Sequence, residues 1–215
     1  MKTFEYWKVI GVAGALAGLV AWPVPGQAQL DLGGILPPIL PAPGPAPTTL
    51  TGQASVATAS VLGNVTSLVD TGTLTDPSDP LGTGLPIGSI PGLLTAESLH
   101  AVTMGWTDQV ASEASLSNLA MSVAGTGVSA DFIQSRALAV SGAVPTGLTS
   151  IEGLTIGGVS VSPTGVPNET ISLGGLSVIL NEQIQSASGI VVNALHVRTL
   201  DGSTDVVVGS AKAGI

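Results

Sequence analysis

Cysteine is absent from this chain of 215 residues, and aromatic side chains are scarce. The lack of cysteine excludes disulfide bonds, thiolate metal sites, cysteine nucleophiles and a lipidated N-terminal cysteine. Aromatic residues make up 3% of the chain, and only Trp106 and Phe132 occur after residue 28. Sugars and single-stranded nucleic acid are usually held by several stacked rings. Two rings far apart in the sequence do not provide such a platform.

Basic residues are also few. The chain has five Lys and Arg residues against 14 Asp and Glu residues, which gives a net charge of −9. Only Arg136, Arg198 and Lys212 follow residue 28, and they are widely separated. A patch that neutralises phosphates needs several clustered cations. We therefore expect neither nucleic acid nor an anionic membrane surface as a partner.

The first residues have the order of a secretory signal peptide. Two lysines precede an uncharged apolar run over 9–22, and a proline follows it. This run is too short for a helix that spans a bilayer core of ~30 Å. We predict a signal peptide over 1–28 that is cleaved between Ala28 and Gln29, with no integral membrane segment after cleavage. An uncleaved membrane anchor is the alternative. Export, together with the lack of cysteine and the acidic charge, indicates a secreted, extracellular or cell-envelope protein of a bacterium.

The rest of the chain divides by composition. Residues 29–50 hold six prolines, which is typical of an extended linker. Residues 51–215 consist mainly of Gly, Ala, Val, Ser, Thr and Leu in short alternating runs, a composition that favours strands. We predict a single all-β domain there, an antiparallel β-sandwich built from hairpins, with a β-solenoid or β-roll as the alternative. Residues 114–124 and 131–140 are two of its strands, although the second could instead form a short helix.

Two segments share one pattern around a pair of glycines. Residues 154–161 read LTIGGVSV and residues 171–178 read ISLGGLSV. A two-residue turn at each pair would place all apolar residues of a segment on one face, with Ile156 opposite Val159 in the first copy. The alternative is a glycine bulge inside a longer strand. The predicted turn residues are Gly157, Gly158, Gly174 and Gly175.

A third hairpin is predicted at the C-terminus. Asp201-Gly202 is typical of a type I′ turn. The register places Arg198 opposite Asp205 as an exposed ion pair, which would contribute ~0–1 kcal/mol. The spacing from Asp201 to Asp205 also occurs at the start of calcium loops, but the downstream bidentate glutamate is missing. The apolar face of this hairpin consists of Leu195, Val197, Val206 and Val208.

The two histidines form no recognisable catalytic or metal-binding pattern. His100 alternates with Val102, which indicates a half-buried structural role. By alternation His196 shares a face with Val192 and Ala194, and no carboxylate is near it in the sequence. Neither a nucleophile elbow nor a His-Glu-x-x-His pattern occurs. We predict no catalytic residue, no cofactor and no metal site.

The last third of the chain resembles a known family. Three stretches carry the resemblance: LNEQ at 180–183, VNALH at 192–196 and DVVVGSAKA at 205–213. They resemble the C-terminal signature of the choice-of-anchor P family, exported bacterial proteins whose shared domain is joined to differing surface anchors. The resemblance implies a surface-associated or secreted β domain with no catalytic residues to carry over. The chain departs from the pattern because it stops at Ile215 without an anchor, which leaves wall attachment open. The motif residues are Asn181, Glu182, Gln183, Asn193, His196 and Asp205.

These observations predict an exported, non-enzymatic structural or interaction protein. Its partner would be an unknown protein or the cell wall, contacted through edge strands or flat faces of small residues. One alternative is a surface protein that assembles by adding strands at its edges. A secreted hydrolase, with a site built from dispersed acids, is a less favoured alternative.

Overall fold

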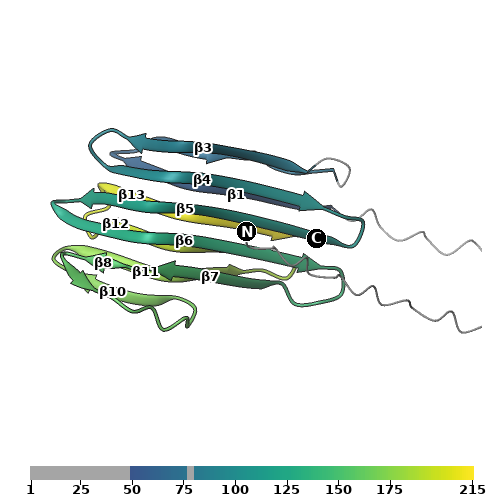
Figure 1. The fold of residues 1–215 in the computed structure, drawn as a ribbon. Helices are drawn as coiled ribbons and strands as arrows, with labels where there is room; N and C mark the ends of the chain where they lie inside the picture. Colours follow the sequence, from purple (N-terminus) through teal and green to yellow (C-terminus); the bar gives the residue numbers. More distant parts are fainter. Residues whose placement is uncertain (1–48, 77–79) are drawn as a thin grey trace, which may run out of the picture. The chain divides into compact units, whose positions relative to one another are not determined.

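Two antiparallel sheets pack face to face in this protein (Figure 1). The computed structural model describes residues 49–76 and 80–215. The predicted signal peptide, its cleavage site at Ala28 and Gln29, and most of the proline-rich linker lie outside the described residues. The described part of the chain has strands and no helix, so the predicted β-sandwich is confirmed and a helix over 131–140 is wrong.

Sheet A has the strand order β10-β11-β12-β13-β1-β2, and sheet B has the order β3-β4-β5-β6-β8-β9, with β7 also paired to β6. All strand pairs are antiparallel. The strands are β1 Thr51–Val61, β2 Asn64–Asp70, β3 Leu81–Ile90, β4 Leu94–Gly105, β5 Gln109–Val123, β6 Thr126–Val140, β7 Thr146–Glu152, β8 Thr155–Ile156, β9 Val159–Ser160, β10 Glu169–Leu173, β11 Leu176–Gln185, β12 Gly189–Thr199 and β13 Thr204–Gly214.

Small aliphatic residues fill the space between the sheets. Val56, Ile133 and Leu195 are fully buried there, among many alanines and valines. The sheets approach closely at Gly209 of β13, where an added Cβ would lie 3.2 Å from the side chain of Ile133 in sheet B. Burial of apolar surface at ~25 cal/mol per Å² is the main stabilising contribution in such a core.

The two glycine pairs form the turns that the sequence predicts. Ile156 pairs with Val159 across the first turn, and Ile171 pairs with Val178 across the second. All four glycines have positive φ angles, the conformation that a type I′ turn requires at both central residues. Local turn chemistry therefore sets the register of both hairpins.

The C-terminal hairpin keeps its predicted register but has a different turn. The N–H of Gly202 donates to the carbonyl of Thr199 at 3.1 Å, and of Asp201 and Gly202 only the glycine has a positive φ, of 73°. The type I′ prediction is therefore wrong. The Asp201 carboxylate accepts the N–H of Ser203 at 2.9 Å, which fixes a side-chain turn instead. Hydrogen bonds from the Thr199 hydroxyl and from Ser203 lower the pKa of Asp201 from 3.8 to about 2.

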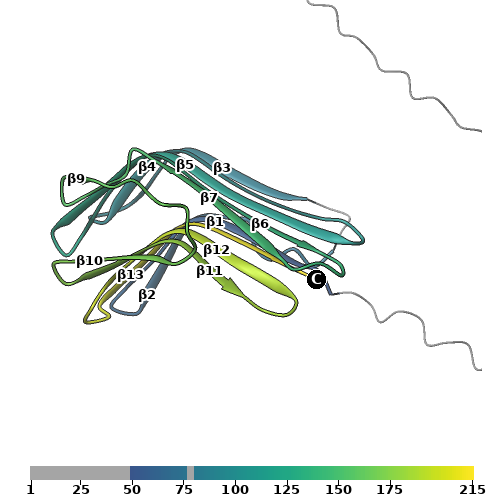
Figure 2. The ribbon, with the colours of Figure 1, turned by 90° about the horizontal axis from the view of Figure 1, so that it is seen from below.

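A row of residues in the left-handed conformation crosses both sheets, and both sheets bend there (Figure 2). The pairing of sheet A keeps its register on either side of the row, but the buried positions shift by one residue. In β12, Val192 and Ala194 face the core before the row, and Leu195 and Val197 face it afterwards. The row consists of Asn181 in β11, Gly209 in β13, Val69 in β2, Ser98 in β4, Asn118 in β5 and Gly153 between β7 and β8.

Candidate functional site

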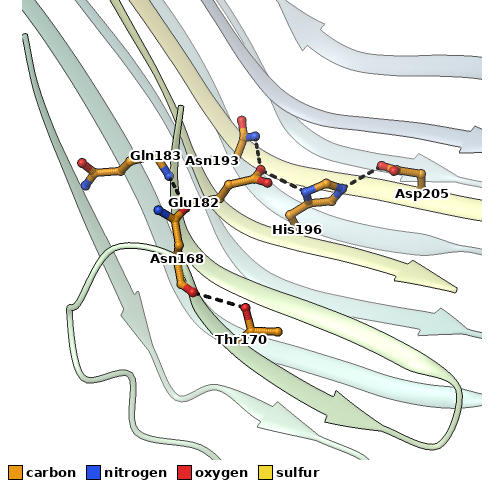
Figure 3. Close-up of polar contacts among 7 residues, drawn as sticks. All are labelled: Asn168, Thr170, Glu182, Gln183, Asn193, His196 and Asp205. Carbon is orange, nitrogen blue, oxygen red and sulfur yellow. Dashed lines mark hydrogen bonds and ion pairs between the residues drawn. The ribbon is translucent and has the colours of Figure 1, made fainter. Parts of the chain in front are cut away.

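Four polar side chains from three neighbouring strands meet on the outer face of sheet A (Figure 3). Glu182 belongs to β11, Asn193 and His196 to β12, and Asp205 to β13. Oε2 of Glu182 accepts a hydrogen bond from Nδ2 of Asn193 at 2.7 Å, and it lies 2.9 Å from Nδ1 of His196. Oδ1 of Asp205 lies 3.0 Å from Nε2 of His196. The network therefore connects three strands at the bend.

The shift of the buried positions in β12 brings this network together. Asn193 and His196 are three residues apart, so strict alternation would place them on opposite faces. Because the shift occurs after Ala194, both lie on the outer face. The prediction that His196 shares a face with Val192 and Ala194 is wrong, since those two residues are buried between the sheets.

His196 is held between two carboxylates. Its side chain is 12% exposed, compared with 14% for Glu182 and 47% for Asp205. An ionised carboxylate can only accept hydrogen bonds, so both ring nitrogens donate when both acids are ionised. That state is the imidazolium, in which the two contacts are charge-assisted and stronger than neutral hydrogen bonds. In this state the ring connects β11 and β13 by two ion pairs.

Asn193 has one polar atom without a partner. The residue is 6% exposed. Its amide nitrogen is directed at Glu182, which fixes the orientation of the amide because the reverse would place two acceptors together. Its carbonyl oxygen Oδ1 is buried and accepts no hydrogen bond from the described residues. Nearly all buried polar atoms have a partner, so this acceptor is unusual.

A hollow of about 310 Å³ adjoins Asn193 on the same face. It extends across β12, β13, β1 and β2, where sheet A bends. Its walls combine hydroxyl, amide and charged groups with two half-buried valines. Residues that define it are Gln53, Ser55, Asn193, Val207, Ser210 and Lys212.

Hydrogen bonds between side chains hold the β1 and β2 side of the hollow. Nε2 of Gln53 donates to Asp70 Oδ1 at 3.0 Å, and Asp70 also accepts the N–H of Gly72 at 2.7 Å. The hydroxyl oxygens of Ser55 and Thr58 lie 3.1 Å apart. These contacts order the short side chains before any ligand binds.

The two remaining motif residues lie on the opposite side of β11 from the network. Nδ2 of Asn181 donates to the carbonyl of Gly165 at 2.9 Å. Nε2 of Gln183 donates to the carbonyl of Gly147 in sheet B at 3.2 Å, and its backbone N–H donates to Oδ1 of Asn168 at 2.9 Å (Figure 3). Asn181 and Gln183 therefore attach β11 to its neighbouring loop and to β7.

Two further predictions about side chains are wrong. Arg198 and Asp205 are paired in the register, but Asp205 contacts His196, and no ion pair of Arg198 occurs among the described residues. The nearly buried imidazole thus competes successfully for the carboxylate. His100 is exposed on the outer face of sheet B and is not half-buried.

The network has limited chemistry available to it. Both nitrogens of His196 contact carboxylates, so neither is free to take a proton from a substrate while these contacts last. Within residues 49–76 and 80–215, no group of three His, Asp or Glu side chains has a geometry that could hold a metal ion. While these contacts last, the network offers hydrogen bonds between strands and no free base.

Comparisons with known proteins add no relative. A scan against protein-family models, a search of curated proteins and a search of solved structures each found no match for this chain. In the part of the chain that the structure describes, no helix has the length and apolar character needed to span a membrane.

Proposed function

We propose that this chain is an exported, non-enzymatic interaction protein of a bacterial cell envelope or the extracellular space, related to the choice-of-anchor P proteins. Its partner contacts the hollow on the outer face of sheet A. The observation that carries the proposal is an ordered hollow lined by hydroxyl, amide and charged side chains, bordered by Asn193 with its unpartnered, buried oxygen. Binding sites are commonly preformed hollows with a few converging polar groups.

Two sequence features support export and the family. The basic, apolar and small-residue order of 1–28 is typical of a signal peptide. Four of the six motif residues that resemble the choice-of-anchor P signature meet in one network: Glu182, Asn193, His196 and Asp205. The proposal of an interaction protein over an enzyme is supported by His196, whose ring nitrogens both contact carboxylates.

Export and binding can be tested together. The full chain, expressed in a bacterium, is expected outside the cytoplasm with Gln29 as its first residue. The purified exported protein is then expected to bind isolated bacterial envelopes, and Val207→Lys, which fills the hollow with a charged side chain, should weaken binding about tenfold. Val102→Lys is the matched control, because Val102 is also half-buried on an outer sheet face. A chain retained whole in the cytoplasm, or equal binding by both variants, would contradict the proposal.

A further inference from the structure

We propose that the hollow on sheet A binds an uncharged carbohydrate through one or two sugar rings; this rests on the proposed function and names its ligand class. The hollow of about 310 Å³ is at the small end of ligand sites, which occupy roughly 300–1,000 Å³. A site of this size accepts one or two sugar rings.

The side chains around the hollow match the two kinds of surface that a sugar presents. Val191 and Val207 supply half-buried aliphatic surface for the C–H groups of a ring. Ser55, Ser210 and Lys212 supply short and long hydrogen-bonding groups for its hydroxyls. The chain has no aromatic ring in this lining, so binding depends on hydrogen bonds over an aliphatic surface and not on stacking.

Asn193 borders the hollow and has a buried oxygen without a partner among the described residues. Its unpartnered Oδ1 needs a donor, and Glu182 prevents the amide from reversing to supply its own nitrogen. Because this oxygen has almost no accessible surface, its donor would be a buried water, which a sugar hydroxyl in the hollow can contact in turn.

The charges near the hollow favour a neutral ligand. Lys212 and Asp70 contribute one charge of each sign to its lining. Glu182 and Asp205 lie alongside and are paired with His196. An added anion would be repelled by the surplus of carboxylates, and an added cation would compete with Gln53 and the Gly72 N–H for Asp70.

An extended peptide fits this surface less well. Peptides that bind sheets usually add a strand at a free edge, where backbone groups are unpaired. The hollow lies mainly over β12, β13 and β1, which are interior strands with partners on both sides. Recognition here therefore comes from side chains, which suits hydroxyl groups better than a peptide backbone.

The test is a titration of the exported protein, labelled with ¹⁵N, with cellobiose, maltose and N,N′-diacetylchitobiose. We expect at least one disaccharide to give saturable shifts at the Asn193 side-chain amide and the Ser210 and Lys212 amides, with a dissociation constant in the millimolar range. Val207→Lys should weaken binding about tenfold or more, and Val102→Lys should leave it unchanged.

Ser210→Ala provides a second variant that removes one hydroxyl and no packing, and it should weaken binding severalfold. No saturable shift with any of the three sugars, or stronger binding of inorganic phosphate at the same residues, would overturn the proposal. If envelope binding still depends on Val207 while all three sugars fail, only the ligand class is wrong. If envelope binding is equal in both lysine variants, the proposed function itself fails.

Discussion

At the scale of single residues, His196 connects the strands on either side of its own. Its ring contacts Glu182 of β11 and Asp205 of β13. His196→Ala removes the contacts of the ring with Glu182 and Asp205, and we expect the free energy of unfolding to fall by about 2 kcal/mol, because a hydrogen bond to a charged group is worth ~1.5–3 kcal/mol when buried and less when partly exposed. Urea unfolding at neutral pH measures this change in the free energy of unfolding. His100→Ala, at an exposed site, should change stability by less than about 0.5 kcal/mol. Equal losses in both variants would contradict the role assigned to His196.

Asp201 gives the hairpin tip a dependence on acid. Hydrogen bonds lower its pKa in the folded state to about 2, below the ordinary value of 3.8. Because its pKa is lowered on folding, ionised Asp201 stabilises the folded state above pH 3.8. This contribution is lost as the pH falls through about 2. The wild type should therefore lose thermal stability more steeply over this range than Asp201→Asn, whose side chain does not titrate. The melting temperature measured against pH tests this, with Asp108→Asn, in the exposed turn before β5, as the control. Parallel curves for the wild type and Asp201→Asn would refute the assignment.

At the scale of the elements, the row of left-handed residues determines which side chains face outward. Gly209 is the member of this row that lies in β13, and its φ is 65°. A Cβ added there would lie 3.2 Å from the side chains of Ala194 and Ile133. Gly209→Ala should cost about 2–4 kcal/mol, from the left-handed backbone and from crowding of the core.

Gly125→Ala separates the two causes. Gly125 has a φ of 78° in the β5–β6 turn, but an added Cβ there meets nothing within 4 Å. Gly125→Ala should lower the free energy of unfolding by only about 1 kcal/mol, the cost of the left-handed backbone conformation for alanine. Chemical unfolding of both variants measures the difference. A loss at Gly125 as large as that at Gly209 would show that close packing at the bend does not matter.

Local patterns predicted some elements and not others. The two glycine pairs could be predicted because a turn and its flanking residues are adjacent in the sequence. The placement of β1 between β13 and β2 could not, because this pairing joins the two ends of the domain. The left-handed residues Val69 and Ser98 carry no local signal, since valine and serine rarely adopt this conformation.

The candidate site divides in the same way. The family resemblance named Glu182, Asn193, His196 and Asp205, but alternation alone placed His196 on the wrong face because the shift after Ala194 was invisible in the sequence. The β1 side of the hollow was missed entirely. Its hydroxyls and amide lie in a run of small residues that looks like any other strand. Only the long-range pairing with β13 brings them to Asn193.

At the scale of the whole molecule, the free edges decide between a monomer and an assembly. The edge strand β3 exposes Leu85 and Ile87, which favours strand addition, but Pro86 between them lacks an N–H. We expect the exported protein to remain monomeric in analytical ultracentrifugation. Pro86→Val should increase association because it restores the missing donor. Fibres of the wild type that bind an amyloid dye would support the self-assembling alternative.

The most direct measurement of the central claim is photo-crosslinking from the hollow in living cells. A photoreactive amino acid replaces Val207, on the outer face of sheet A, or Val102, on the outer face of sheet B. The full chain is exported before irradiation, and the products are separated by mass. We predict a discrete adduct from position 207 and none from position 102. Adducts of equal yield from both positions, or an adduct from position 102 alone, would contradict the assignment of the hollow as the contact surface.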